Sequence, residues 1–240
     1  MSVQPVVLQK YVPAWGLPDI SPFCVKVELY CKMADIPYRT TLGDPRKAPK
    51  GKMPVIVDGG RTIPDSSAIV EHLEATRGRP LDRDLTPRQI ATATAVRSML
   101  EEHLYFIGLY LRWHQDSGWR VYLPTFLDLF GQFGIPRPMR PLLAFRARRS
   151  VKQALHGQGT SRHQLEEIEA TGKRILDALG ELCEGPFFFG ERPSSVDATA
   201  FAFVQSIVGA PFEGPLKEHA RKHPKLRAYY EHVRSLYFKD

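Results

Sequence analysis

The first 80 residues alternate between the two periods of hydrophobic patterning that distinguish strands from helices. Short runs rich in β-branched and aromatic residues predict strands, and 54–63 predicts a hairpin that turns at the sequence DGG. The expected strands are 6–12, 38–42 and the two arms of that hairpin. Apolar residues at helical spacing predict helices over 22–36 and 66–78. The predicted order is therefore β-α-β followed by β-β-α.

The rest of the chain carries the helical period alone. Residues 79–87 are polar and contain prolines, which predicts a linker. The helices expected beyond it are 88–114, 161–183, 193–208 and 224–237. The pattern therefore predicts two domains, an α/β domain over 1–78 and an all-helical domain over 88–240.

The composition agrees with a globular protein. Of 240 residues, 43% are hydrophobic and 25% are charged, which leaves ample residues for a buried core. No apolar run reaches the roughly 18 residues that predict a membrane span, and the N-terminal residues lack the pattern of a secretory signal. Three cysteines at no framework spacing are expected to be reduced thiols. We therefore expect a cytoplasmic protein without an integral membrane segment.

The net charge of +7 arises in one segment of the chain. Residues 129–165 contain seven Lys or Arg and neither Asp nor Glu, so the rest of the chain is neutral. Nucleic acid and an anionic membrane surface both attract such a segment. Because no nucleic-acid motif accompanies it, a solvated basic face is the preferred interpretation. Nucleic-acid binding is not expected, and a weak peripheral membrane contact stays open.

Several motifs that would identify an activity are absent. The chain contains no phosphate-binding glycine loop, no GxSxG elbow and no HExxH zinc pair. His219 and His223 are four residues apart, but the cationic Arg221 and Lys222 between them oppose a dication. We therefore expect neither a nucleotide nor a metal.

Ser21 precedes Pro22 at the start of the helix predicted over 22–36. Ser followed by Pro is typical of an N-cap and a first helical residue, and this alone explains Ser21. The same geometry has a functional interpretation, because a helix N-terminus stabilises a thiolate and a Ser hydroxyl can donate a hydrogen bond to it. Cys24, one turn further on, is either a thiol of lowered pKa or a small core residue.

Two further segments combine a structural with a functional interpretation. A cis peptide between Met53 and Pro54 would turn the Met53 backbone outward, where an extended peptide could pair with it. A trans proline would instead mark an edge strand. Asp65 and Ser66 begin a helix as caps do, and they could also hold an α-amino acid, Ser66 its carboxylate and Asp65 its ammonium. A Ser/Asp capping box at 194–197 is assigned no chemistry.

The order and spacing of these motifs resemble the glutathione transferase superfamily along nearly the whole chain. The matching motifs are SPFC, KMPV, DSSAIVEHL, PSSVDA and HPKLRAYYEHV. A narrower similarity, to the branch of failed-axon-connections and metaxin-like proteins and their bacterial relatives, is carried by SPFCVKVELYCKMADIPY, MLEEHLYFIGLYLRW and GQGTSRHQLEEI. The resemblance implies a thioredoxin-like, glutathione-binding N-terminal domain and an all-helical C-terminal domain.

The resemblance also implies roles, residue by residue. Ser21 corresponds to the hydroxyl that activates the thiolate in serine-type transferases. Met53, before a cis Pro54, would pair through its backbone with the cysteinyl unit of glutathione. Asp65 and Ser66 match the pair that holds the γ-glutamyl end.

The glycyl end of glutathione has a less complete match. Lys52 lies near the position that reaches the glycyl carboxylate. Pro and Gly residues between 43 and 52 leave a short helix or none where other transferases have a helix. Arg46, Lys47 and Lys50 offer a flexible cationic rim in its place.

We therefore expect a glutathione transferase that activates its co-substrate glutathione as a thiolate for attack on a hydrophobic electrophile. The electrophile would lie between the domains, with Tyr105, Arg112 and Trp113 as candidate wall residues. Detoxification and a homodimer accompany this expectation. The alternatives are a non-catalytic, metaxin-like binding protein and a thiol–disulfide enzyme acting through Cys24, in which Ser21 replaces the first Cys of a CPxC pair.

Overall fold

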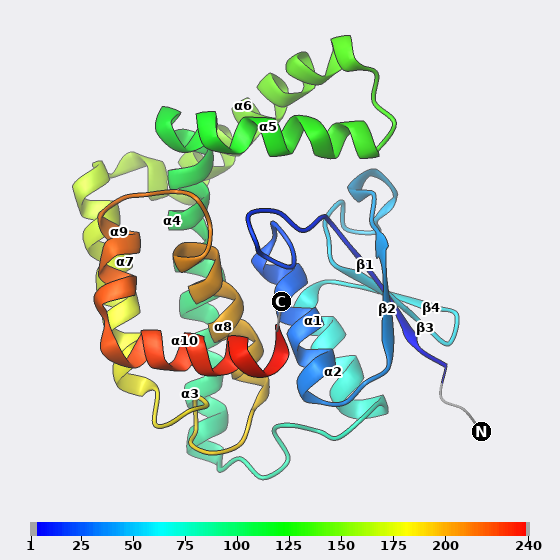
Figure 1. The fold of residues 1–240 in the computed structure, drawn as a ribbon, viewed down its shortest axis with the longest axis vertical. Helices are drawn as coiled ribbons and strands as arrows, with labels where there is room; N and C mark the ends of the chain where they lie inside the picture. Colours follow the sequence, from blue (N-terminus) through cyan, green and yellow to red (C-terminus); the bar gives the residue numbers. More distant parts are fainter. Residues whose placement is uncertain (1–3, 239–240) are drawn as a thin grey trace.

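The computed structural model describes residues 4–238, in which a four-stranded sheet lies beside an assembly of helices (Figure 1). The strands are β1 (Val6–Lys10), β2 (Tyr38–Leu42), β3 (Val55–Asp58) and β4 (Arg61–Pro64). Their order in the sheet is β2-β1-β3-β4. The β1–β2 pair is parallel, and β3 runs antiparallel to both β1 and β4. This mixed sheet is the thioredoxin-like arrangement that the family resemblance implies.

Helices α1 (Pro22–Met33) and α2 (Ser66–Thr76) lie on the same side of the sheet (Figure 1). Ten of the twelve α1 residues are buried, because α1 is enclosed between the sheet and the helices that follow. The predicted helix 22–36 extends beyond the observed end of α1. Asp35 adopts a left-handed φ of 54° there and turns the chain toward β2, while Ile36 packs into the core from outside the helix.

The region after residue 86 is helical throughout its regular structure. Its helices are α3 (Pro87–Ser98), α4 (Tyr105–Leu109), α5 (Asp116–Gln132), α6 (Arg140–Gln158), α7 (Leu165–Leu182), α8 (Ser195–Val208), α9 (Pro215–Lys222) and α10 (Pro224–Tyr237). One stretch of π-helix, Met99–Leu104, joins α3 to α4, and a second, Tyr110–His114, continues the rod to His114, as predicted for 88–114. The predicted linker 79–87 falls on irregular chain between α2 and the start of α3.

The sequence patterns did not delimit α5, α6 or α9. Pro124 lies inside α5, and three prolines surround the start of α6, so both helices carry residues that usually end a helix. In the structure α5 and α6 lie together beyond one end of α1 (Figure 1). An aromatic cluster around Trp113 holds them to the long rod.

One hydrophobic cluster runs through both halves of the molecule, from Val6 on β1 to Val233 on α10. The α1–α8 contact joins the halves, and polar contacts reinforce it. The Ser195 hydroxyl donates to the Asp82 carboxylate over 2.5 Å, and the Lys32 ammonium donates to the Tyr237 carbonyl over 2.7 Å. Within residues 4–238, no helix combines the length and the apolar character needed to cross a bilayer.

Candidate functional site

The front and rear halves enclose a cavity of about 810 Å³, and all nine site residues singled out from the sequence line it. The front half contributes Ser21, Lys52, Met53, Pro54, Asp65 and Ser66. The long rod contributes Tyr105, Arg112 and Trp113. The fold therefore brings together residues that lie up to 92 positions apart, while their individual roles stay predictions.

Ser21 occupies the N-cap position of α1, but its side chain makes no capping hydrogen bond. Its backbone N–H donates to Asp19 Oδ1 over 2.8 Å. The position is the one predicted, whereas the expected capping role of the hydroxyl is wrong. The hydroxyl is therefore not committed to the helix end, and Ser21 lies on the cavity wall.

Asp19 supports this segment and was not recognised in the sequence. Its side chain is buried, and burial raises its pKa to about 7 although the Ser21 N–H and nearby Lys10 oppose the rise. One carboxylate oxygen has no hydrogen-bond partner in the described part of the chain. The signal that could have revealed it is an Asp two residues before an N-cap position, an arrangement that favours an Asx turn.

Cys24 lies one turn into α1 and is fully buried beside Met53 and Val55. Burial, and then the charge of Asp19, raises the pKa of its thiol well above the ordinary value. The interpretation of Cys24 as a thiol of lowered pKa is therefore wrong. It is a core residue that supports the cavity wall from behind.

The peptide bond between Met53 and Pro54 is cis, the alternative that exposes backbone to a ligand. The Met53 side chain is buried, and its sulfur lies so close to Gly43 that a Cβ there would approach Sδ to 2.2 Å. Glycine at position 43 thus allows the chain to cross over this side chain. Lys52 stands exposed at the rim of the cavity.

The segment before Met53 contains one short 3₁₀ turn, Pro45–Lys47, in agreement with the prediction of a short helix or none. The expected flexible cationic rim is wrong for Arg46, whose guanidinium donates three hydrogen bonds to the Asp44 carboxylate. This contact lowers the pKa of Asp44. Lys50 instead lines the cavity, with its Nζ 3.5 Å from Asp65 Oδ2.

Asp65 caps α2, since its Oδ1 accepts hydrogen bonds from the N–H groups of Ser67 at 3.0 Å and Ala68 at 3.4 Å. Its φ of 80° is left-handed, which directs the carboxylate back over the helix end. Burial would raise its pKa, but the two amides and Lys50 outweigh that effect and hold it below the ordinary value. Asp65 is therefore ionised at neutral pH.

A buried charge pair beneath the start of α2 was missed in the sequence. The Lys26 ammonium of α1 forms a 2.7 Å ion pair with Glu101 of the long rod, and it donates to the hydroxyls of Ser66 at 3.2 Å and Ser67 at 3.0 Å. Burial lowers the pKa of Lys26, and Glu101 opposes this. The pair joins three helices beside Asp65 and Ser66, the clamp predicted for the γ-glutamyl end. Hydrophobic patterning offers no signal for a lysine inside an apolar helix.

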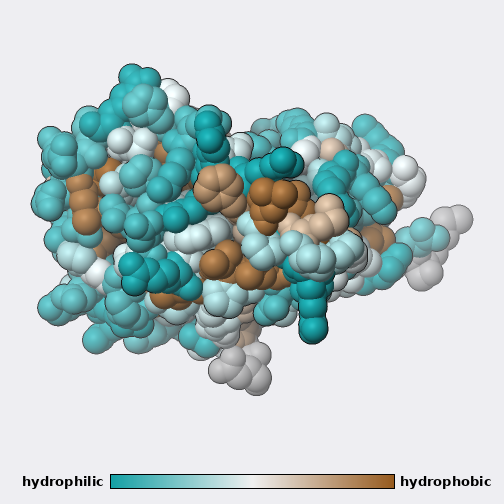
Figure 2. All heavy atoms as spheres, turned by 90° about the horizontal axis from the view of Figure 1, so that it is seen from above, coloured by the Kyte–Doolittle hydropathy of each residue, from teal (hydrophilic) through white to brown (hydrophobic). Residues whose placement is uncertain are grey.

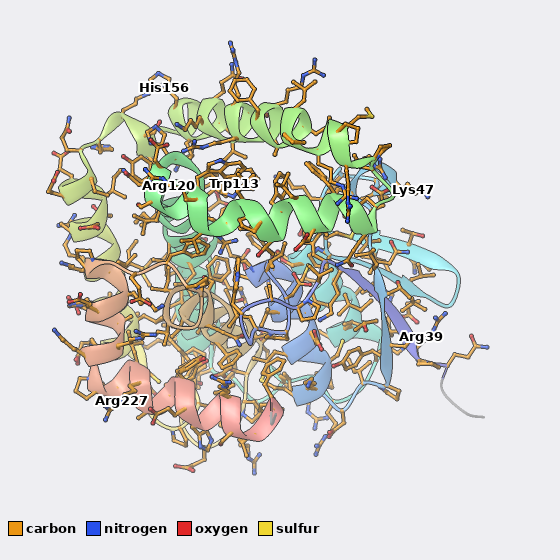
Figure 3. The ribbon with its side chains drawn as sticks, turned by 45° about the horizontal axis from the view of Figure 1, so that its top comes forward. Arg39, Lys47, Trp113, Arg120, His156 and Arg227 are labelled. Atoms are coloured by element: carbon orange, nitrogen blue, oxygen red, sulfur yellow. The ribbon has the colours of Figure 1, made fainter. Side chains whose placement is uncertain are left out.

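The rear wall combines aromatic rings with one buried cation. The Tyr105 ring packs edge-on against Phe23 with centroids 4.9 Å apart. Trp113 lies between α5 and α6 (Figure 3) and packs on Tyr122 at 5.0 Å. Tyr105 and Trp113 are therefore part of the aromatic lining that an apolar ligand would contact.

Arg112 enters this wall next to Ser21, because its Nη1 donates to the Ile20 carbonyl over 3.1 Å. Its guanidinium carbon lies 5.3 Å from the Tyr122 ring centroid and 5.1 Å from that of Phe212. Its Nε is buried without a hydrogen-bond partner in the described structure, and burial lowers its pKa. Among residues 4–238, Arg112 is therefore a donor-rich cation whose partners are the Ile20 carbonyl and Tyr122 and not a carboxylate.

A thioredoxin-like unit followed by a helical unit, with a cavity between them, defines a class of fold that solved structures share. A glutathione transferase from Phanerochaete chrysosporium aligns over 100% of both chains with a TM-score of 0.62 and 16% identity. Among the residues that the structure describes, no group of His, Cys, Asp or Glu side chains could hold a metal ion.

Sequence comparisons give the family. The glutathione S-transferase N-terminal domain matches residues 22–118, and the glutathione S-transferase C-terminal domain matches residues 172–233. The isoprene-epoxide–glutathione S-transferase of Rhodococcus sp. (strain AD45) is 35% identical over 95% of this chain and 97% of its own length. The chain belongs to the glutathione S-transferase family.

Two animal relatives define the branch of the family. Failed axon connections of Drosophila melanogaster is 30% identical over 93% of this chain, and metaxin-1 of Homo sapiens is 28% identical over 93%. This chain spans 56% of the length of the fly protein and 49% of the human one. The predicted resemblance to the metaxin-like branch and its bacterial relatives is confirmed.

Proposed function

We propose that the protein is a glutathione transferase that holds glutathione in the 810 Å³ cavity and activates its thiol beside Ser21. The observation that carries this proposal is the convergence on one cavity of the α1 N-terminus, the cis Met53–Pro54 peptide and the α2 N-terminus. Family membership and the Rhodococcus relative support it. A cytoplasmic location, a homodimer and detoxification remain predictions.

Glutathione would bind across the front wall. The Ser66 N–H and hydroxyl would receive the γ-glutamyl carboxylate, since Asp65 already accepts from the N–H groups of Ser67 and Ala68. Because Lys26 already donates to the Ser66 oxygen, the Ser66 proton is available for that carboxylate. The Met53 backbone would pair with the cysteinyl unit, and Lys52 would face the glycyl carboxylate.

Ser21 would act on the thiol. A thiol with a pKa near 8.5 is about 3% thiolate at pH 7, and lowering the pKa by about two units makes it roughly three-quarters thiolate. The donors for this shift are the Ser21 hydroxyl and the positive end of α1. Two observations support this role: the Ser21 side chain makes no capping hydrogen bond, and Ser21 lines the cavity.

The electrophile we propose is a small epoxide. The thiolate would attack one epoxide carbon, so that a C–S bond forms, the C–O bond breaks and its electron pair remains on oxygen. Arg112 stands next to the Ser21 segment with an unpartnered Nε and would stabilise that oxygen as it becomes an alkoxide. Burial raises the pKa of Tyr105, whose hydroxyl therefore keeps the proton that the alkoxide needs. The name of the Rhodococcus relative supports this substrate class.

Replacement of Arg112 by Met tests the electrophile site. Loss of one charge-assisted contact should lower kcat/KM for a small epoxide by about ten- to a hundredfold. An activated aryl chloride, which forms no alkoxide, should react at a rate within about threefold of the wild-type rate. Equal losses with both electrophiles would contradict the role of Arg112.

A non-catalytic binding protein is the second candidate. The similarity to metaxin-1 favours it, as does the single 3₁₀ turn that precedes Met53. The two candidates differ in glutathione affinity, which calorimetry measures. A thiol–disulfide enzyme is not favoured, because the Cys24 thiol is fully buried with a raised pKa.

A further inference from the structure

The outward face of α6 carries an unusual concentration of exposed apolar side chains. Met139, just before the helix, is 53% exposed, and Leu142 and Phe145 on its first turns are 54% and 63% exposed. Seven consecutive positions thus hold three large apolar side chains that the fold leaves in solvent. Figure 2 looks down on this end of the molecule and shows hydrophobic spheres set among hydrophilic ones.

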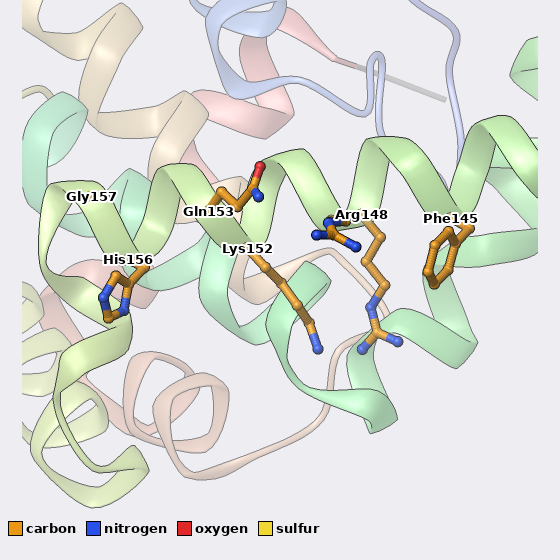
Figure 4. Close-up of a pocket in the computed structure, with 7 residues that line it drawn as sticks. Phe145, Arg148, Lys152, Gln153, His156 and Gly157 are labelled. Atoms are coloured by element: carbon orange, nitrogen blue, oxygen red, sulfur yellow. The ribbon is translucent and has the colours of Figure 1, made fainter.

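Cations continue the same face toward the C-terminal end of α6. Arg149 and Lys152 border a shallow hollow of about 670 Å³ together with Phe145 and His156 (Figure 4). Arg146 is exposed beside them. No hydrogen bond or ion pair ties Arg146, Arg149 or Lys152 to another of the described residues.

Arg148, which also borders the hollow, and the buried side of α6 hold the helix to the molecule. Arg148 donates to the Trp113 carbonyl over 2.8 Å and pairs with Asp116 at 2.6 Å, and Ala144 and Leu155 are buried. On this side of α6, Ala147, Ser150 and Val151 line the 810 Å³ cavity. The apolar and basic face is therefore presented rigidly to solvent by a helix that also covers the site.

We propose that this face of α6 docks on an anionic lipid surface. A basic face with projecting Leu and Phe side chains suits a bilayer interface, where cations meet headgroups and apolar side chains enter the acyl boundary. A second copy of the same face is disfavoured, because 129–165 contains seven cations and no acidic residue, so two such faces repel. Exposed apolar side chains offer nothing to a nucleic-acid backbone.

Vesicle sedimentation tests this proposal with the full-length protein. Phosphatidylcholine vesicles and vesicles that contain about 30% phosphatidylglycerol are compared at low salt. Because each cation near an anionic bilayer strengthens binding by about fivefold, the anionic vesicles should bind at least about tenfold more protein. Salt near 0.5 M should reverse most of this difference.

Two variants separate the contributions of charge and apolar surface. Replacement of Arg146, Arg149 and Lys152 by Gln should weaken binding to anionic vesicles by about a hundredfold. The double variant Leu142→Ser with Phe145→Ser should weaken it by about ten- to a hundredfold and should leave the salt dependence in place. Matched controls are Gln at the exposed Arg39, Arg61 and Arg88, of which Arg39 lies on β2 away from α6 (Figure 3), and Ser at the exposed Ile90 and Leu236.

Four results would overturn the proposal. The first is equal binding to neutral and anionic vesicles, and the second is an equal loss in the α6 variants and their controls. The third is a wild-type protein that does not bind vesicles but forms a concentration-dependent dimer in sedimentation, while the Leu142/Phe145 variant stays monomeric. Tighter binding to duplex DNA than to anionic vesicles at the same salt would likewise reject a lipid partner. Circular dichroism and melting of each variant confirm that the fold is intact.

Discussion

Ser21 and Cys24 lie three residues apart, yet the first turn of α1 places them in opposite surroundings. Ser21 lines the cavity, whereas the Cys24 thiol is enclosed beside Met53 with a raised pKa. The local sequence places both residues at the N-terminus of the same helix and does not distinguish their surroundings. Their difference follows from which side of α1 the β3 region covers, and that is a tertiary property.

Ser21→Ala should separate activation of glutathione from its binding. Without the donor, the pKa of the bound thiol should rise, and conjugation turnover should fall about tenfold or more, while affinity changes little. Ultraviolet absorbance of the bound thiolate against pH measures the first effect, and steady-state turnover measures the second. Cys24→Ser is the control. If it abolishes turnover while Ser21→Ala does not, the assignment of Ser21 is wrong.

Asp19 should make the free energy of unfolding depend on pH, and a single substitution can isolate this contribution. Burial raises its pKa from 3.8 to about 7, so the folded protein holds this proton more tightly than the unfolded chain does. Its contribution to the free energy of unfolding is therefore fully present below 3.8 and is lost as the pH rises through about 7. Asp19→Asn keeps an oxygen for the Ser21 N–H and removes the titration.

We compare the free energy of unfolding of Asp19→Asn with that of the wild type at two pH values. The difference, variant minus wild type, should be about 1–3 kcal/mol larger at pH 8 than at pH 5. Urea denaturation of both proteins at the two pH values measures this difference. A difference in unfolding free energy that does not change with pH would contradict the buried, titrating carboxyl.

The chain sequence predicts the cap chemistry of α8 better than that of α1, where Ser21 makes no capping hydrogen bond. The capping box of α8 is present, with the Ser194 N–H and hydroxyl both donating to Asp197 Oδ2, at 2.8 Å and 2.7 Å. The structure adds a partner that sequence spacing does not indicate, because Asp197 Oδ1 also accepts from the Phe188 N–H over 2.7 Å. Asp197 thus joins the loop before α8 to the helix.

Asp197→Ala should lower the free energy of unfolding by about 2–4 kcal/mol, since it leaves three buried donors without an acceptor. Thermal or urea denaturation measures the loss. Glutathione affinity, measured on the folded fraction, should stay within about twofold of the wild-type value. A selective loss of glutathione binding at unchanged stability would show that Asp197 belongs to the ligand site.

The strands, α1 and α2 could be predicted because each is short, regular and bounded by its own turn residues. The Gly59–Gly60 turn, with both φ values positive, is an example. By contrast, α5 and α6 contain or follow prolines, and their burial depends on the aromatic cluster around Trp113. The Lys26–Glu101 pair joins residues 75 positions apart, a distance over which one sequence carries no pairing signal.

At the scale of the whole molecule, the front half depends on the rear half. Because α1 has ten of twelve residues buried and packs on α8, the predicted domain 1–78 would expose a large apolar face by itself. We expect residues 1–78 alone to bind a hydrophobic dye and to lack a cooperative melt. The full chain should melt in one transition. A fragment that melts cooperatively at the temperature of the full chain would contradict this dependence.

Glutathione binding by the full chain, measured by calorimetry, tests the central claim most directly. The account predicts one site of micromolar to low-millimolar affinity, weakened by about 1.5–3 kcal/mol in Asp65→Ala and in Ser66→Ala. Arg61→Ala, at an exposed position outside the cavity, is the control and should not change affinity. Absence of binding at about 10 mM glutathione, or affinity that neither clamp variant changes, would contradict the account and leave the binding-protein alternative.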